Sequence, residues 1–151
     1  MSLETKLMQR LQAAEKEMIS IRRHLHRHPE ISFHEKETAH YIKQFYQGLD
    51  CQIRDCGTGY GIIVDIIGGH SGPKIALRAD FDALAIQEDN DLPFKSVNPG
   101  AMHACGHDAH TAYLLVLAKQ LIALKADLHG SVRILHQPAE EGERKISCVN
   151  A

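Results

Sequence analysis

The sequence of 151 residues has no excess of either charge, because 17 Lys and Arg stand against 19 Asp and Glu, for a formal net charge of −2. A nucleic-acid-binding domain needs a basic surface, which this balance does not provide. No apolar run approaches the ~20 residues that span a bilayer, and Met1 to Lys6 is charged rather than apolar. We therefore expect no nucleic-acid or membrane partner and a cytoplasmic location.

CxxC spacing is also absent from the four cysteines, Cys51, Cys56, Cys105 and Cys148. Together with the lack of a signal region, this indicates free thiols in a reducing compartment. The sequence contains no internal repeat, no low-complexity tract and no clear linker. A length of 151 residues then predicts one domain with a sizeable core.

Histidine is over-represented, with 11 residues, and it is the commonest metal-binding side chain. Met102 to Thr111 holds three histidines, one cysteine and one aspartate within ten residues. Cys105 and His107 are two positions apart, so in a turn their ligand atoms can reach one point and bind a zinc-class ion. The alternative is that Cys105 is a small buried hydrophobe and the histidines are caps or surface groups.

A pair of adjacent glutamates, Glu140 and Glu141, follows an alternating, strand-like segment that ends near Gln137. Adjacent side chains at a strand end point in different directions. One carboxylate can therefore bind a metal while its neighbour takes a proton from water, as a metal-dependent hydrolase requires. A solvated surface pair is the alternative interpretation.

Apolar periodicity predicts a layered α/β domain, with a mixed sheet flanked by helices. A Ser-x-x-Glu capping box of Ser32 and Glu35 is expected to start the second helix. The segment 87–100 is expected to form a loop over the site, and 68–73 a hairpin-type connection. The predicted helices are 3–26, a second that begins at the Ser32 cap, continues through 38–46 and ends near Gly48, and a third over 111–126. The predicted strands are 51–54, 62–67, 74–80 and 131–137.

Two further groups of polar residues need interpretation. His24, His26 and His28 suggest a metal site, but residues two apart face different sides of a helix. Compensation of the helix dipole and local hydrogen bonding are therefore the favoured interpretation. Asp80 and Asp82 fall where a strand ends, a common place for catalytic residues in α/β sheets. A turn aspartate or a helix cap is the alternative for each.

Four motifs in order and at the right spacing resemble the zinc-peptidase-like amidohydrolases, which include hippurate hydrolase, N-acyl-L-amino-acid amidohydrolase and the plant auxin-conjugate hydrolases. The resemblance covers about residues 10 to 141. It implies a mixed-sheet catalytic domain, a smaller lid domain that often forms the dimer contact, and two divalent metal ions (Zn, Mn, Co or Ni). The motifs are residues 22–30 (RRHLHRHPE), 78–84 (RADFDAL), 102–108 (MHACGHD) and 137–141 (QPAEE).

The resemblance also implies roles for individual residues. Cys105, His107 and Glu141 correspond to metal ligands, Glu140 to the general base, and Asp80 to an aspartate that orients the metal site. Relatives have a ligand histidine two places before that aspartate. Arg78 stands there in this chain, and Cys105 is the compensating ligand. The implied reaction is hydrolysis of the amide bond of a small N-acylated amino acid, in a protein that can form a homo-oligomer.

The sequence departs from the family after Glu141. We expect residues 1–141 to form the N-terminal part of the catalytic domain and 142–151 an atypical tail, since relatives continue with further histidine ligands and the lid. A frameshift, a premature stop or deliberate shortening would each explain this. We therefore expect the chain to be inactive alone. The alternatives are a non-catalytic metal-binding or interaction domain that retains half of the site, and an ordinary α/β domain with a vacant site.

Overall fold

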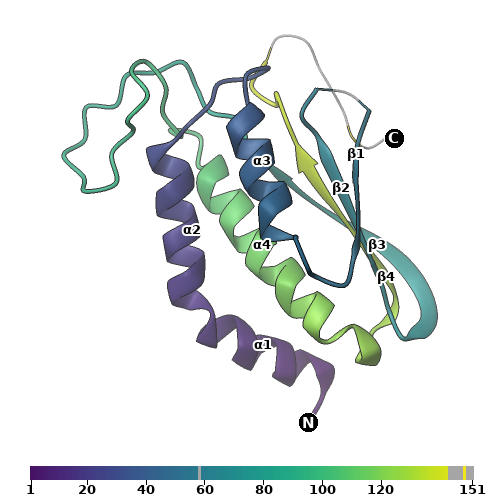
Figure 1. Ribbon diagram of the computed structural model, residues 1–151. Coiled ribbons are helices and arrows are strands. Elements are labelled where there is room, and N and C mark those ends of the chain that lie inside the picture. Colours follow the sequence, from purple (N-terminus) through teal and green to yellow (C-terminus); the bar gives the residue numbers. More distant parts are fainter. Residues whose placement is uncertain (58, 143–147, 149–151) are drawn as a thin grey trace.

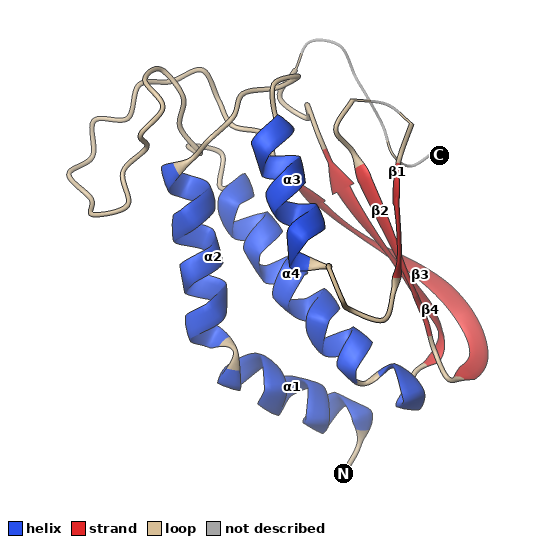
Figure 2. Cartoon of the chain, viewed as in Figure 1, coloured by secondary structure: helices blue, strands red, loops and turns tan. Residues whose placement is uncertain are grey.

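The computed structural model describes residues 1–57, 59–142 and 148, and in them four α-helices lie on one side of a four-stranded sheet (Figures 1 and 2). The predicted fold class is therefore confirmed. The helices are α1 (Leu3–Ala13), α2 (Glu15–Arg27), α3 (Lys36–Phe45) and α4 (His107–Ala123), with a 3-10 turn η1 (Lys125–Asp127). The strands are β1 (Gln52–Asp55), β2 (Ile62–Ile67), β3 (His70–Asp80) and β4 (His129–Gln137).

The strand order is β1-β2-β4-β3, with β3 and β4 parallel and the other neighbours antiparallel. The hairpin predicted between the second and third strands is wrong, because β4 lies between β2 and β3. The connection from β2 to β3 instead runs beside the start of β4. There Gly68 N–H donates to Gly130 O, and His70 N–H donates to Leu128 O. The parallel register places Asp80 opposite Gln137, so β3 and β4 end side by side.

The single helix predicted over 3–26 is two helices, which meet at Ala14. Ala14 has φ −92° and ψ 6°, outside helical values. The apolar stripe continues across this residue, but the axis bends there, and both α1 and α2 pack against α4 (Figure 1). Periodicity predicted the buried face correctly and could not show the bend, which is set by packing on α4.

The predicted capping box at α3 is also wrong. Ser32 Oγ donates to Asp82 Oδ2 at 2.8 Å, and Glu35 Oε1 accepts from the backbone N–H of Ala139 at 2.7 Å. The cap comes from Glu30, whose carboxylate accepts from the N–H groups of Glu37 and Thr38, at 3.2 and 2.7 Å. The two residues expected to start a helix instead hold segments around the candidate site.

The main core lies between the helices and the sheet, where α4 is buried on most of its surface. Ile62, Val64 and Ile66 of β2 face this core, as alternation along a strand requires. Ile63 and Leu135 point to the opposite face, where they cluster with Cys56 and Cys148. Those two cysteines are joined by a disulfide, so the prediction of free thiols holds for Cys51 and Cys105 and is wrong for Cys56 and Cys148.

The segment 87–100 forms neither helix nor strand, as predicted. The segment contacts the C-terminal end of α2, where Val97 N–H donates to Arg27 O and the Arg27 guanidinium donates to Pro93 O. The expectation that it covers the site stays a prediction. Within the described residues, no helix is both long enough and apolar enough to cross a bilayer.

Candidate metal centre

Three chain segments meet at the edge where β3 and β4 end. Asp82 follows β3, Glu141 follows β4, and His107 is the first residue of α4. Gly106 caps α4 with φ +92°, a left-handed conformation that glycine adopts without steric cost. This sharp turn places Cys105 and His107, on either side of the glycine, toward the same space.

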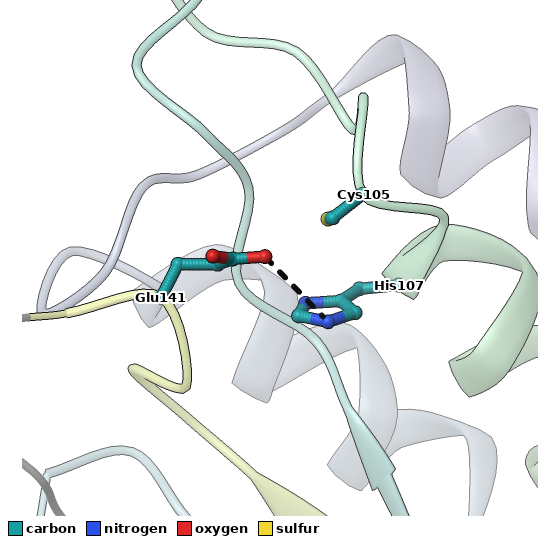
Figure 3. A group of neighbouring side chains, drawn as sticks. All are labelled: Cys105, His107 and Glu141. Carbon is teal, nitrogen blue, oxygen red and sulfur yellow. Dashed lines mark ion pairs between the residues drawn. The ribbon is translucent and has the colours of Figure 1, made fainter.

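Cys105, His107 and Glu141 form a group of potential metal ligands, and their ligand atoms all lie within 4.8 Å of one another (Figure 3). His107 Nε2 is 4.0 Å from Glu141 Oε1, the pair joined by the dashed line in Figure 3. Thiolate, imidazole and carboxylate are the donors that zinc-class ions prefer. The structure therefore brings together the three residues predicted as ligands, in an arrangement that fits a divalent metal.

Asp82 orients two of these three residues. His107 Nδ1 lies 3.2 Å from Asp82 Oδ1 and 3.0 Å from the Asp82 carbonyl oxygen. Because both are acceptors, Nδ1 carries a proton, and Nε2 is left as the ring nitrogen that lies near Glu141 and can bind a metal once its own proton is displaced. The other carboxylate oxygen of Asp82 accepts from the backbone N–H of Glu141 at 2.9 Å.

These contacts determine the charge balance at the site. Burial raises the pKa of Asp82, but hydrogen bonds from His107, Glu141 and Ser32 outweigh it and hold that pKa below its ordinary value. Burial lowers the pKa of His107, but the hydrogen bond to Asp82 and the nearby Cys105 sulfur outweigh it and raise that pKa to about 11. A metal at Nε2 would therefore replace a firmly held proton.

The two residues predicted for catalysis lie at the same edge of the sheet. Glu140 is half-buried in the turn that carries Glu141. Asp80 is bound by the Arg78 guanidinium at 2.5 and 2.8 Å, and its second oxygen is 3.8 Å from His110 Nδ1. The carboxylate in contact with His107 is that of Asp82, and the orienting role expected of Asp80 stays a prediction. Sequence analysis placed both aspartates at the strand end but could not tell which one points inward.

The remaining histidines of the motif are not among the three converging ligands. His103 is buried, neither of its ring nitrogens has a hydrogen-bond partner among the described residues, and burial lowers its pKa to about 4. His110 is half-exposed, and its Nδ1 lies 3.8 Å from Asp80 Oδ2.

A buried network behind the site was missed. His26 Nδ1 lies 2.7 Å from Asp108 Oδ2, and His26 Nε2 lies 3.1 Å from Glu88 Oε1. Arg22 Nε donates to the same Asp108 oxygen at 2.9 Å. These contacts connect α2, the 87–100 segment and the first turn of α4. The sequence held one signal for this network. His26 lies at the end of the apolar stripe of the first predicted helix, which places it on the buried side.

This fold and donor set define a metallopeptidase-type α/β domain, and comparisons with known proteins agree. The model of peptidase family M20/M25/M40 matches residues 76–149. N-acetyl-L-cysteine deacetylase of Bacillus subtilis (strain 168) is 50% identical over 131 residues, which are 87% of this chain and 32% of that protein. N-acyl-L-amino acid amidohydrolase of Geobacillus stearothermophilus is 46% identical over 125 residues, 83% of this chain and 34% of that protein.

Solved structures give the same result. The Bacillus subtilis YXEP protein, described as a dinuclear metal binding peptidase from the M20 family, aligns with a TM-score of 0.80 and 46% identity, over 86% of this chain and 36% of that one. A protein from methicillin resistant Staphylococcus aureus aligns with a TM-score of 0.90 and 53% identity, over 92% and 36%. The chain belongs to the M20/M25/M40 peptidase family, as the resemblance predicted, and spans about a third of the length of these curated relatives.

Proposed function

We propose that this chain supplies part of the metal centre of an amidohydrolase that cleaves N-acylated amino acids into a carboxylate and a free amino acid. The observation that carries the proposal is the convergence of Cys105, His107 and Glu141 within 4.8 Å, with Asp82 holding the His107 ring in the orientation a ligand needs. Relatives named for deacetylation or hydrolysis of N-acyl amino acids support the substrate class.

Each residue at the site has a definite task in this proposal. Cys105, His107 and Glu141 hold a divalent ion (Zn, Mn, Co or Ni), which supplies Lewis acidity toward an amide carbonyl and toward water. Glu140 acts as the general base: it takes a proton from water and passes it to the leaving nitrogen. Asp82 holds the proton on His107 Nδ1, and Gly106 permits the turn that aligns Cys105 with His107.

A two-ion centre needs more ligands than these three side chains provide. We therefore propose that the 151-residue chain alone binds metal but does not turn over substrate at a useful rate. Three expectations stay predictions: the division into residues 1–141 and 142–151, the homo-oligomer and the cytoplasmic location. Within the expected tail, the structure describes only residues 142 and 148.

Metal binding tests the proposal directly. We expect zinc, manganese or cobalt to bind the wild-type chain in calorimetric titration, and cobalt to give a thiolate charge-transfer absorption band. The double variant Cys105→Ala, His107→Ala should lose both signals. His110→Ala is the matched control, because His110 is outside the converging group, and it should bind like the wild type. Equal binding by the double variant and the wild type would refute the ligand assignment.

The second candidate is a non-catalytic metal-binding domain, favoured by the fact that the three ligands already converge without further residues. Release of amino acid from N-acetylmethionine and hippurate, with added metal, separates the two functions. Metal-dependent turnover that disappears in Glu140→Gln would show that this chain is itself a catalyst. Metal binding without turnover fits both the non-catalytic domain and the partial centre. A version extended to the full length of the relatives then separates them, because metal-dependent turnover by it supports the partial centre.

A further inference from the structure

The disulfide between Cys56 and Cys148 lies on the face of the sheet opposite the helices, next to the turn that carries Glu140 and Glu141. Cys56 follows β1, and its N–H donates to Gly61 O at 3.0 Å across the β1–β2 turn. Cys148 lies 92 positions further along the chain, with its Cα 5.3 Å from that of Cys56. This separation is within the range of about 4.4–6.8 Å that disulfides require.

The surroundings of the two sulfurs are closely fitted. Cys56 and Cys148 are 4% and 1% exposed and pack with Ile63 and Leu135. Gly61 lies against both sulfurs, and a Cβ at this position would overlap both of them. Here the absence of a side chain is what allows the two cysteines to meet, and Gly61 is therefore part of the disulfide site.

Cys148 is also connected to the end of β4. Its backbone N–H donates to Gln137 Oε1 at 3.0 Å, and Gln137 Nε2 donates to Pro138 O at 2.7 Å. Gln137, the last residue of β4 before the Glu140–Glu141 turn, therefore binds the backbone of Cys148 through its side chain. On its other side the turn is held by Glu35, at Ala139, and by Asp82, at Glu141.

We propose that the Cys56–Cys148 disulfide is a covalent tie that fixes the Glu140–Glu141 turn against the sheet and so positions Glu141 for the metal. Its effect on metal affinity rests on the proposed function; its effect on the turn does not.

The disulfide forms by exchange with a low-molecular-weight disulfide such as oxidised glutathione. One cysteine thiolate attacks a sulfur of that compound and displaces one small thiolate, which leaves a mixed disulfide. The second cysteine thiolate attacks the protein sulfur and displaces the other small thiolate. Two protein thiols are oxidised, and one small disulfide is reduced to two small thiols. Because both sulfurs are buried, exchange occurs before the cysteines dock, and the finished bond is shielded from reductant.

The first test is chemical. After oxidation with glutathione disulfide, non-reducing digestion and mass analysis should show Cys56 linked to Cys148. Cys51, a free cysteine, is the internal control and should remain unlinked to either. Gly61→Ala keeps both thiols, but its methyl group should prevent their approach and lower the yield of the linked peptide. Links distributed equally among Cys51, Cys56 and Cys148 would overturn the proposal.

The second test measures the turn without metal. Amide hydrogen exchange at Ala139 and Glu141 should be slower in the oxidised chain than in Cys56→Ser, Cys148→Ser or the double variant. These three variants and the reduced wild type should exchange alike, because each lacks the same single bond. Equal exchange in the oxidised chain and the variants would overturn the tie, even where the disulfide forms.

The third test measures the metal. Metal affinity of the oxidised chain should exceed that of Cys148→Ser by about tenfold, the effect typical of groups that orient a ligand. Cys51→Ser, oxidised in the same way, should match the wild type. Equal affinities would overturn the positioning of Glu141 by the tie. If neither the wild type nor any variant binds metal in a way that depends on Cys105, the proposed function is wrong. The hydrogen-exchange measurement still tests whether the disulfide fixes the Glu140–Glu141 turn.

Discussion

Asp82 connects three distant parts of the chain through one buried carboxylate. It meets His107 at the start of α4, the backbone of Glu141 after β4, and Ser32 before α3. His107 and Glu141, two of the proposed metal ligands, are thus both held by this one group through short hydrogen bonds. The carboxylate of Asp80, two residues earlier, binds the Arg78 guanidinium instead.

Replacing each aspartate by asparagine tests this difference. Asp82→Asn keeps the shape but removes the charge, so His107 loses the partner that fixes its tautomer, and metal affinity should fall by about tenfold or more. Asp80→Asn should change affinity less, because the Asp80 carboxylate contacts Arg78 and His110 rather than Cys105, His107 or Glu141. Titration calorimetry measures both, with circular dichroism to confirm folding. A larger loss in Asp80→Asn would restore the role first expected for Asp80.

His136 should make the stability of the fold depend on pH. It is fully buried beside Tyr46, whose hydroxyl is 2.9 Å from His136 Nε2, and burial lowers its pKa from the ordinary 6.5 to about 3. Between these values the unfolded chain binds a proton at this residue and the folded chain does not. Stability from this group is therefore complete above pH 6.5 and is lost as the pH falls toward 3, by about 1.4 kcal/mol per pH unit.

The variant His136→Gln isolates that contribution, since glutamine can accept from Tyr46 without titrating. Urea unfolding of both proteins at several pH values between 4 and 7 should show a smaller pH slope in the variant. Parallel curves for the two proteins would mean that His136 titrates alike in both states.

At the scale of elements, α3 depends on a cap from outside its own segment. The Glu30 carboxylate accepts from Glu37 N–H, Thr38 N–H and Thr38 Oγ1. Glu30→Ala should therefore lower the free energy of unfolding by about 1 kcal/mol, the usual loss of an N-terminal cap. Gln44→Ala, an exposed substitution near the other end of α3, is the control and should leave the urea midpoint nearly unchanged. Equal midpoints for Glu30→Ala and the wild type would contradict the cap.

The elements also show what periodicity can predict. Sequence analysis found the strands at 62–67 and 131–137 and the helix that contains residue 111, because each is a run that carries apolar residues and has no Gly or Pro inside it. The order of the strands, the bend at Ala14 and the cap of α3 were not found. The order of the strands and the bend depend on residues far apart in sequence, such as Val64 and Ile134, which pair in β2 and β4. The cap of α3 comes from Glu30, seven and eight positions before the N–H groups that it binds and outside the capping-box spacing. A local pattern carries no signal for such a contact.

The candidate site likewise has residues that the sequence predicted and contacts that it could not. Cys105, His107 and Glu141 were predicted from the chemistry of their side chains and from family motifs, and the structure brings them together. The contact of Asp82 with His107 was missed, because it depends on which way the chain turns after β3. His26 was assigned to the helix end, although the fold buries it against Asp108 and Glu88.

At the scale of the molecule, the sheet has two edges of unequal length within the described residues. β1 has four residues, whereas β3 has eleven, most of them exposed. Ile75 of β3 is 52% exposed and lies beside an apolar hollow lined by Leu7, Leu77 and Leu121. A long edge strand offers backbone donors and acceptors to another chain, and exposed apolar side chains strengthen such pairing.

We therefore expect concentration-dependent self-association through β3, which would account for the predicted homo-oligomer. Ile75→Lys should weaken it, because a charged side chain on an edge strand opposes pairing with a second copy. Ile53→Lys makes the same change on β1, where Ile53 is 43% exposed, and should have a smaller effect because four residues offer fewer backbone contacts. Sedimentation velocity over a range of protein concentrations measures both variants against the wild type. If Ile53→Lys dissociates the protein and Ile75→Lys does not, the association runs through β1, and the β3 edge has no part in it.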